Sequence, residues 1–335
     1  MYKVSGVKIA KLISAVPKNQ YTVLEYASDL LDEKAAQQHA KAIGFSKLRI
    51  APEDMTVGNL FKAAAEKMLA GYDKSNIGGL VIVSHTPDYR SPSLGHVMQD
   101  VLGLPVQTLC LDINEGCSGY ASGLYTSALM AKSMQKAVLL LGGDVISKHT
   151  HPKDSATRTI MGDAVYALLV EPGDEEIFFS FTSYGEKRGI IVEDNNGERK
   201  VENPRNEGKV YFDGVEIMSF VMAEVPPLIK ATIEAAGLTQ DDISLYAMHQ
   251  ANKMLLKLLS MKLKVAPAKM PFVVGETGNM SSACIPYLLT VSKDKDLSKV
   301  FGCGFGVGMS ASCTIADYSK TEIMEPIEVE DCTPL

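Results

Sequence analysis

The 335-residue chain has no tryptophan, no Cys-x-x-Cys pair and no apolar run of membrane-spanning length. A transmembrane helix needs roughly 18 apolar residues, and the first 17 residues alternate like a strand rather than a signal peptide. The six cysteines have no histidine at metal-ligand spacing, which favours reduced thiols in a cytoplasmic protein. With a net charge of −7, there is no general reason to expect nucleic acid or an anionic membrane as a partner.

What is present is typical of a large globular core, since 46% of the residues are hydrophobic and 22% are charged. Short apolar runs predict buried strands, and longer amphipathic or apolar runs predict helices. The expected strands are 80–83, 107–111, 137–141, 164–170, 245–248 and 299–301, and the expected helices are 57–69, 119–134 and 219–235.

A short pattern recurs at half the chain length. Residues 70–77 and 236–243 both run from Ala-Gly at a helix end, through a polar turn, to an isoleucine that leads into an apolar strand. Their glycines, Gly71 and Gly237, lie 166 positions apart and suit the end of a helix. A match of eight residues can arise by chance, but its position favours a duplicated α/β unit.

Two segments fall outside this plan. Residues 174–206 mix short apolar runs with polar turns and are interpreted as strands and loops that connect the halves. Residues 319–335 form an acidic tail, which we expect to lie outside the fold as a surface or mobile segment.

Three residues stand out for their chemistry: Cys117 in Gly-Cys-Ser-Gly-Tyr, His249 in His-Gln-Ala-Asn, and Asn279 in Gly-Asn-Met-Ser-Ser-Ala. A thiol, a base and an amide can supply the nucleophile, proton acceptor and hydrogen-bond donor of acyl chemistry. Cys117 also falls between a predicted strand and a predicted helix, where free N–H groups favour a thiolate and an oxyanion. Each residue has a structural alternative: an inert buried thiol, a satisfied core histidine and a turn asparagine.

These motifs closely resemble the β-ketoacyl-acyl carrier protein synthase III family of thiolase-like condensing enzymes. Met-Gly-Asp-Ala at 161–164 and Phe-Gly-Cys-Gly at 301–304 complete the family's order, and Asn279 is typical of its type III branch. The resemblance implies a duplicated, five-layered αβαβα fold, with an N-terminal half at 1–172, a C-terminal half at 173–318 and the acidic tail at 319–335. It also implies a homodimer.

The resemblance further assigns roles to residues. An acyl group moves from a thioester to Cys117, and the backbone N–H groups of Cys117 and Cys303 hold the oxyanion. His249 and Asn279 stabilise the enolate formed when malonyl-acyl carrier protein loses carbon dioxide, and the enolate then attacks the acyl-enzyme. Acyl-coenzyme A or acyl-carrier protein donates the acyl group, and no metal or redox cofactor is required. The glycines at 302–308 form the oxyanion loop only by this resemblance, because tight packing alone can explain them.

A basic stretch follows the histidine. Residues 243–275 hold five lysines and no acid, although the whole chain is acidic. Lys253 and Lys257 share a helix face and suit an acidic partner, which the resemblance identifies as acyl carrier protein. A solvated helix face is the alternative.

Four positions depart from the family pattern. Gln38 and Ala42 replace a tryptophan and an arginine that clamp the adenine of coenzyme A, and Met254 replaces a further arginine. Ser91 replaces the residue, commonly aromatic, that crosses the dimer to close the acyl pocket. These changes predict a primer other than acetyl-coenzyme A and a roomier acyl pocket, as in a specialised, polyketide-like pathway.

Three other functions remain as alternatives. An acyltransferase of the same fold would move the acyl group to an alcohol or amine without decarboxylation. A papain-like protease shares the order Cys, His, Asn, but no tryptophan follows Cys117 and Asn114 replaces the cysteine expected three residues before it. An inactive partner subunit would have lost its nucleophile, whereas Cys117 is present.

Overall fold

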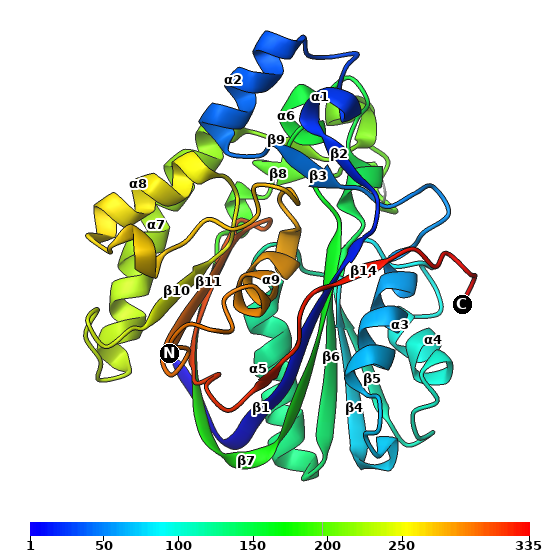
Figure 1. Ribbon diagram of the computed structural model, residues 1–335, viewed down its shortest axis with the longest axis vertical. Helices are drawn as coiled ribbons and strands as arrows, with labels where there is room; N and C mark the ends of the chain where they lie inside the picture. The colour runs from blue at the N-terminus through cyan, green and yellow to red at the C-terminus, as the bar shows by residue number, and fades with distance from the viewer. Residues whose placement is uncertain (196) are drawn as a thin grey trace.

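The computed structural model describes residues 1–195 and 197–335, which form a large mixed sheet with helices on its faces and two small two-stranded sheets (Figure 1). The helices are α1 (Val23–Tyr26), α2 (Glu33–Ile43), α3 (Val57–Met68), α4 (Leu94–Val101), α5 (Gly119–Met134), α6 (Ser155–Arg158), α7 (Gly214–Ala235), α8 (Lys253–Leu263) and α9 (Cys284–Thr290). The strands are β1 (Tyr2–Pro17), β2 (Gln20–Thr22), β3 (Lys47–Arg49), β4 (Ile77–Val83), β5 (Leu109–Ile113), β6 (Ala137–Asp144), β7 (Ala164–Ser183), β8 (Ile191–Val192), β9 (Tyr211–Phe212), β10 (Leu245–Met248), β11 (Val300–Gly306), β12 (Ser310–Ala316), β13 (Glu322–Ile323) and β14 (Ile327–Val329). The two small sheets are β2-β3 and β8-β9.

The main sheet has the strand order β10-β11-β12-β7-β6-β4-β5, and β1 also pairs with β7. The long strand β7 belongs to both parts of this sheet. Its first part, Ala164–Val170, pairs with β6, whereas its last part, Phe178–Ser183, pairs with β12. The predicted boundary after residue 172 falls between these two parts of β7, and the division into halves stays a prediction.

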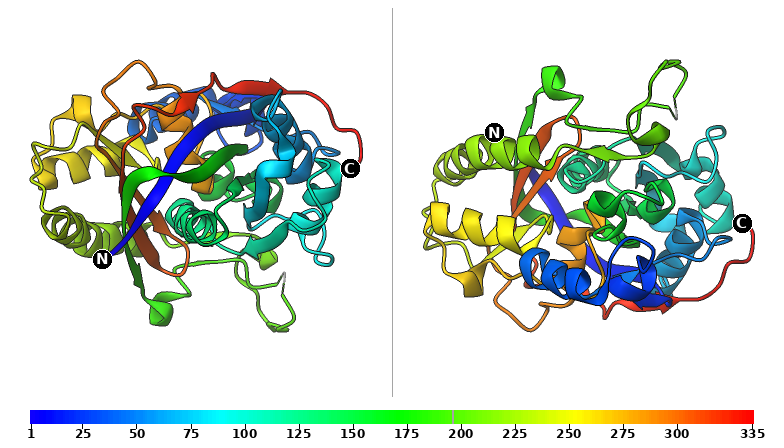
Figure 2. Two further views of the ribbon diagram at one scale, coloured as in Figure 1. Left: turned by 90° about the horizontal axis from the view of Figure 1, so that it is seen from below. Right: turned by 90° about the horizontal axis from the view of Figure 1, so that it is seen from above.

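Three apolar clusters separate the helical layers from the sheet. One lies under α3 and α4, against one face of β4, β6 and β7. The second surrounds α5 and α9 between the two ends of the sheet, and the third lies under α7 and α8, against β10, β11 and β12. Figure 2 shows α5 enclosed by strands on either side. The order of layers is therefore helix, sheet, helix, sheet, helix, and the expected five-layered thiolase-like fold is confirmed.

The recurring pattern occupies equivalent places in this architecture. Helix α3 leads into β4 and helix α7 into β10, as expected, although α7 begins at Gly214, earlier than predicted. Gly71 and Gly237 both adopt left-handed φ values, +76° and +72°, which a glycine reaches without the strain of a side chain. The two turns are thus alike in conformation as well as in sequence.

The acidic tail is part of the fold, contrary to our expectation. Strands β13 and β14 pair in parallel with β1, and Val329 is buried. Four tail acids form ion pairs: Glu322 with Lys11, Glu325 with Lys293, Glu328 with Arg49 and Glu330 with Lys18. The prediction of a tail outside the fold was wrong because it considered only the acidic residues. These residues alternate with apolar residues that face the core, which is the pattern of a half-buried strand.

Strand β5 differs from the buried strand that its apolar residues predict. Leu109 and Leu111 remain 45% and 38% exposed, and within the described residues β5 pairs only with β4. The strand begins two residues later than expected and ends just before the loop that carries Cys117. No helix in the described part of the chain is long and apolar enough to cross a membrane.

Candidate active site

Cys117 lies in the turn between β5 and α5, as predicted. Ser118 is the N-cap of α5, so the thiol stands next to the free N–H groups of the helix N-terminus. Two hydroxyls of β12 hold this turn. The Ser118 and Ser310 hydroxyls are 2.7 Å apart, and the Ser312 hydroxyl donates to the carbonyl oxygen of Ser118 at 2.7 Å.

Glycines of β11 let this strand approach the Cys117 turn closely. A Cβ added at Gly304 would lie 2.5 Å from the Cys117 carbonyl oxygen, and one at Gly306 would lie 2.8 Å from the Cys117 Cβ. Both spacings are too short for a side chain, so the glycine run has a packing role. The same approach brings the backbone of Val307 close enough to the sulfur to affect its pKa.

Burial controls the ionisation of Cys117. Together with the negative charge of Asp144, burial raises the pKa of the thiol to about 12, against the opposing effects of the Ser281 hydroxyl and the backbone groups of Cys117 and Val307. The thiol is therefore protonated at neutral pH, in contrast to the thiolate that its place at a helix terminus predicted. Its proton must leave when the sulfur attacks a substrate.

The His-Gln-Ala-Asn motif extends from the end of β10 into α8, and its polar residues have distinct contacts. The His249 backbone N–H donates to the Cys303 carbonyl oxygen at 2.7 Å. Gln250 points inward, where its side chain donates to the carbonyl of Met248 at 2.9 Å and accepts from the Val273 N–H at 3.0 Å. Asn252 caps α8 by accepting from the Leu255 N–H at 2.8 Å.

The His249 imidazole is neutral in this environment. Burial lowers its pKa to about 4, against an opposing effect of the Ser281 backbone. Its Nδ1 is buried and finds no hydrogen-bond partner among the described residues, and the ring packs edge-on to Phe305 at 5.4 Å between centroids. A neutral imidazole can accept a proton or donate one hydrogen bond.

Asn279 is fixed by backbone bonds to the Met-Gly-Asp-Ala segment. Its N–H donates to Ile160 at 2.7 Å, and its carbonyl accepts from Gly162 at 3.0 Å. Its side-chain oxygen accepts from the Ser281 N–H at 3.2 Å. Because that oxygen is occupied, the amide NH₂ group is the part of the side chain left to donate to a ligand.

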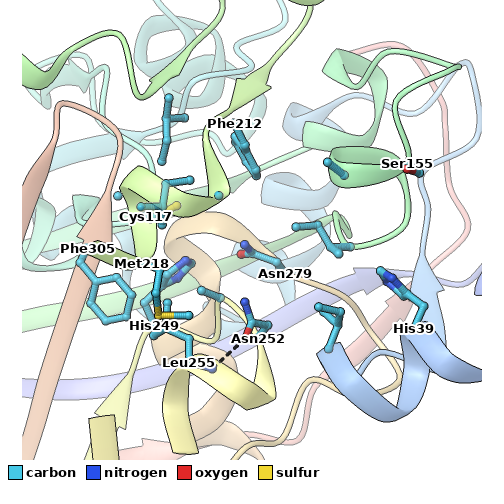
Figure 3. Close-up of a pocket in the computed structure, with 18 of the residues that line it drawn as sticks. His39, Cys117, Ser155, Phe212, Met218, His249, Asn252, Leu255, Asn279 and Phe305 are labelled. Atoms are coloured by element: carbon cyan, nitrogen blue, oxygen red, sulfur yellow. Dashed lines mark hydrogen bonds between the residues drawn. The ribbon is translucent and has the colours of Figure 1, made fainter. Parts of the chain in front are cut away.

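Cys117, His249 and Asn279 line one cavity of about 390 Å³, which is within the usual size range of small-molecule sites. Figure 3 shows the three side chains close together, with Asn252 and Leu255 of α8 beside them. The other walls are mostly apolar: Leu31, His39, Ile43, Ile160, Ile191, Phe212, Ile217, Met218, Ala251 and Phe305 are among them.

Cys303, whose N–H is predicted to be the second oxyanion donor, is not among the residues that line this cavity, and its role stays a prediction. The residue is fully buried within β11, paired with Met248 on one side and Cys313 on the other, and its sulfur lies 3.5 Å from that of Cys313. Gly306 and Val307, farther along the same glycine run, are the residues next to the Cys117 sulfur.

The remaining predicted residues lie on the surface. Lys253 and Lys257 are exposed on α8, with Met254 beside them. Gln38 and Ala42 are exposed on α2, while their neighbours His39 and Ile43 face the cavity. Ser91 is exposed in the loop before α4 and lines none of the cavities described.

Several cavity residues had no signal in the sequence. Ile191 and Phe212 belong to the β8–β9 ribbon. Ile191 lies in the segment 174–206, interpreted only as connecting strands and loops, and Phe212 lies beyond it, where no element was predicted. His39 lies on α2, in a helix that the apolar pattern did not identify. Ser281 is an exception, since it belongs to the Gly-Asn-Met-Ser-Ser motif and could have been selected with Asn279.

Two family models match this chain. 3-Oxoacyl-[acyl-carrier-protein] synthase III matches residues 111–186, and its C-terminal counterpart matches residues 233–318. A solved structure of a 3-oxoacyl-(acyl-carrier protein) synthase from Burkholderia xenovorans is 32% identical, covers 98% of each chain and has a TM-score of 0.93. The chain belongs to the 3-oxoacyl-acyl carrier protein synthase III family.

Two curated synthases have similar coverage. A putative 3-oxoacyl-[acyl-carrier-protein] synthase 3 from Campylobacter jejuni is 27% identical over 93% of this chain and 94% of its own length. A β-ketoacyl-[acyl-carrier-protein] synthase III from Halalkalibacterium halodurans is 29% identical over 92% and 95%. As a member of the synthase III family, the chain is a condensing enzyme of the acyltransferase type.

Proposed function

We propose that this synthase III family member accepts an acyl group on Cys117 and condenses it with malonyl-acyl carrier protein. The single observation that carries this proposal is the cavity that brings a buried thiol, a neutral imidazole and an asparagine amide together. Fatty acid or specialised, polyketide-like biosynthesis is the metabolic setting, and the cytoplasm is the expected location.

In the first half-reaction, the Cys117 sulfur attacks the carbonyl carbon of an acyl thioester. The thiol is protonated, so neutral His249 takes its proton as the carbon–sulfur bond forms. The backbone N–H of Cys117 stabilises the oxyanion together with that of Cys303, as the resemblance predicts, or that of Val307, which lies next to the sulfur. The carrier leaves as a thiolate and recovers the proton from His249.

In the second half-reaction, malonyl-acyl carrier protein loses carbon dioxide, and the electron pair of the broken bond becomes an enolate. The low pKa of His249 keeps its imidazole neutral, so it donates one hydrogen bond to the enolate oxygen and the Asn279 amide donates another. The enolate carbon then attacks the Cys117 thioester. The Cys117 sulfur leaves as a thiolate, which takes up a proton from solvent, and a 3-oxoacyl thioester is released. These steps require no metal or redox cofactor.

The surface around the cavity supports two partners. The exposed Lys253 and Lys257 begin α8, whose residues Asn252 and Leu255 line the cavity, so an acidic acyl carrier protein bound there could insert its arm. The exposed apolar edge of β5 suits a second copy of this chain, in a homodimer that extends the sheet. In such a dimer the Ser91 loop would close the partner's acyl pocket.

The decisive experiment is intact-protein mass spectrometry after mixing the protein with a panel of acyl-coenzyme A and acyl-carrier thioesters. We expect one acyl group to be added to the wild type and none to Cys117→Ala. A chase with malonyl-carrier protein should remove the adduct and release carbon dioxide. No adduct with any donor would contradict the proposed role of Cys117.

The same chase separates condensation from the alternative activity. An acyltransferase that moves the acyl group to an alcohol or amine also forms the Cys117 adduct, but malonyl-carrier protein would not discharge it. Loss of the adduct only on addition of an alcohol or amine, without carbon dioxide, would replace condensation with acyl transfer.

A further inference from the structure

A second cavity of about 480 Å³ lies on the other side of Cys117. The two cavities share Cys117, Ile191 and Phe212 in their walls. Ile191 and Phe212 are directly paired in the β8–β9 ribbon, which therefore borders both spaces. An acyl group on the Cys117 sulfur can extend into either one.

The geometry assigns the two ends of the substrate to different cavities. The first cavity contains His249, Asn279 and the start of α8, next to the exposed lysines proposed to bind the carrier. The carrier arm therefore fills the first cavity while its thioester meets Cys117. This leaves the second cavity for the far end of the acyl group.

The second cavity is more polar than the first, and its polar groups come from separate segments. His85 and Asn114 lie on the loops that follow β4 and β5, and Ser281 follows Asn279. Glu193 also lines the cavity, but its carboxylate is paired with His149 at 2.9 Å. An alkyl chain alone would bury these groups without offering them a hydrogen bond, which is costly.

Arg188 lines the second cavity, and its positive charge is not paired with a carboxylate of the described residues. Its guanidinium has a long hydrogen bond, 3.4 Å to the carbonyl of Gly185. The side chain is exposed as well as lining the cavity, so it stands at the open end, away from Cys117. A guanidinium presents paired donors that fit a carboxylate.

We propose that the second cavity selects acyl groups that end in a carboxylate, with Arg188 as the residue that binds it. This inference rests on the proposed function of Cys117 and specifies its acyl donor as the thioester of a short dicarboxylic acid. The carboxylate pairs with Arg188 while the thioester carbonyl lies at the Cys117 sulfur.

The test compares two pantetheine thioesters, glutaryl and its methyl monoester, which differ in terminal charge and need no carrier-protein docking. The rate of Cys117 acylation is measured by mass spectrometry for the full chain. We expect the glutaryl donor to react about tenfold faster or more, the equivalent of one charge-assisted hydrogen bond. Arg188→Gln should remove this preference.

Lys187→Gln is the matched control, because it removes the same charge from the adjacent residue, whose ammonium lies over Tyr184 and Phe220 and not in the cavity. It should keep the preference for glutaryl. Both variants should react with the methyl ester at the wild-type rate, which also shows that they fold.

Equal rates for the two donors in the wild type, or equal losses with both donors in Arg188→Gln, would overturn the carboxylate site. Acylation of Cys117 by either donor would still support the proposed function in that case. If neither these nor the other donors acylate Cys117, the proposed function fails together with this inference.

Discussion

Strands β5 and β10 end the same sheet at opposite edges, and each leads directly to a proposed catalytic residue. All four residues of β10 are buried, because α7 and α8 cover the strand before it reaches His249. In β5, by contrast, Leu109 and Leu111 are exposed just before the Cys117 loop. His249 thus follows a strand that its own chain covers, whereas Cys117 follows an edge strand with exposed leucines.

In the proposed homodimer, assembly would act on the Cys117 side of the sheet more than on the His249 side. Pairing of two β5 edges would stabilise the Cys117 loop, while the β10 side needs no such support. The predictions below test that contrast, beginning with the residue at the end of β10.

The largest effect is expected from His249→Ala. Loss of its hydrogen bond to the enolate should lower condensation about 10²–10³-fold, the usual cost of removing a donor to a developing oxyanion. Acylation of Cys117 should also slow, since the proton acceptor is gone. Both rates come from the mass-spectrometric assay with malonyl chase.

Asn279→Ala is the companion variant for that measurement. It should lower condensation to a similar extent but leave acylation near the wild-type rate, because Asn279 acts only on the enolate. Equal effects of the two variants on both half-reactions would contradict these separate roles.

Leu111→Lys tests the exposed edge of β5. A charge at this position should disfavour edge-to-edge pairing and raise the dimer dissociation constant at least about hundredfold, since two symmetry-related leucines lose their burial. Analytical ultracentrifugation measures the association, and the acylation assay reports whether Cys117 loses reactivity with it.

Val215→Lys is the control for this variant, because Val215 is 79% exposed on α7. This helix packs on β10, β11 and β12, at the opposite end of the sheet from β5. It should leave association unchanged. A wild type that is monomeric at all concentrations, or a Leu111→Lys variant that still dimerises, would rule out β5 as the interface.

The smallest effect is expected from reversing Lys253 and Lys257 to Glu on the β10 side. Carrier-protein substrates should then show a KM raised about tenfold, with pantetheine thioesters unaffected, since charge pairs steer the encounter. The control is a double variant in which Lys67 and Lys132 are both changed to Glu, which gives the same net charge. These two lysines are exposed on α3 and α5. Equal KM changes in the two double variants would indicate a general charge effect instead of docking on α8.

The sequence predicted those features that depend on local pattern. Cys117, His249 and Asn279 were selected because each lies in a short motif next to a predicted strand or turn. The glycines and other small residues in these motifs predicted places where two backbone segments approach each other closely. Buried strands such as β10 followed from short apolar runs, and the paired glycines at 71 and 237 predicted equivalent turns. These features could be predicted because each is determined by residues adjacent in the chain.

Features that depend on distant contacts were missed or misplaced. The approach of Gly306 and Val307 to the Cys117 sulfur was not predicted, because it depends on how β11 packs against the turn that carries Cys117. Phe212 and Arg188 enter the cavities from a loop-rich segment without periodicity. The acidic tail was misjudged because its pairing with β1 joins opposite ends of the chain.

That last pairing has a consequence for how the protein is made. Strand β1 is synthesised long before its partners β13 and β14, and the carbonyl of Thr333, after β14, accepts a hydrogen bond from Asn59 of α3. Until β13 and β14 have left the ribosome, one side of β1 remains an open strand edge that invites aggregation. The sheet therefore cannot be completed until about 300 residues after β1 have been made, and this stage is where we expect the nascent chain to depend most on chaperones.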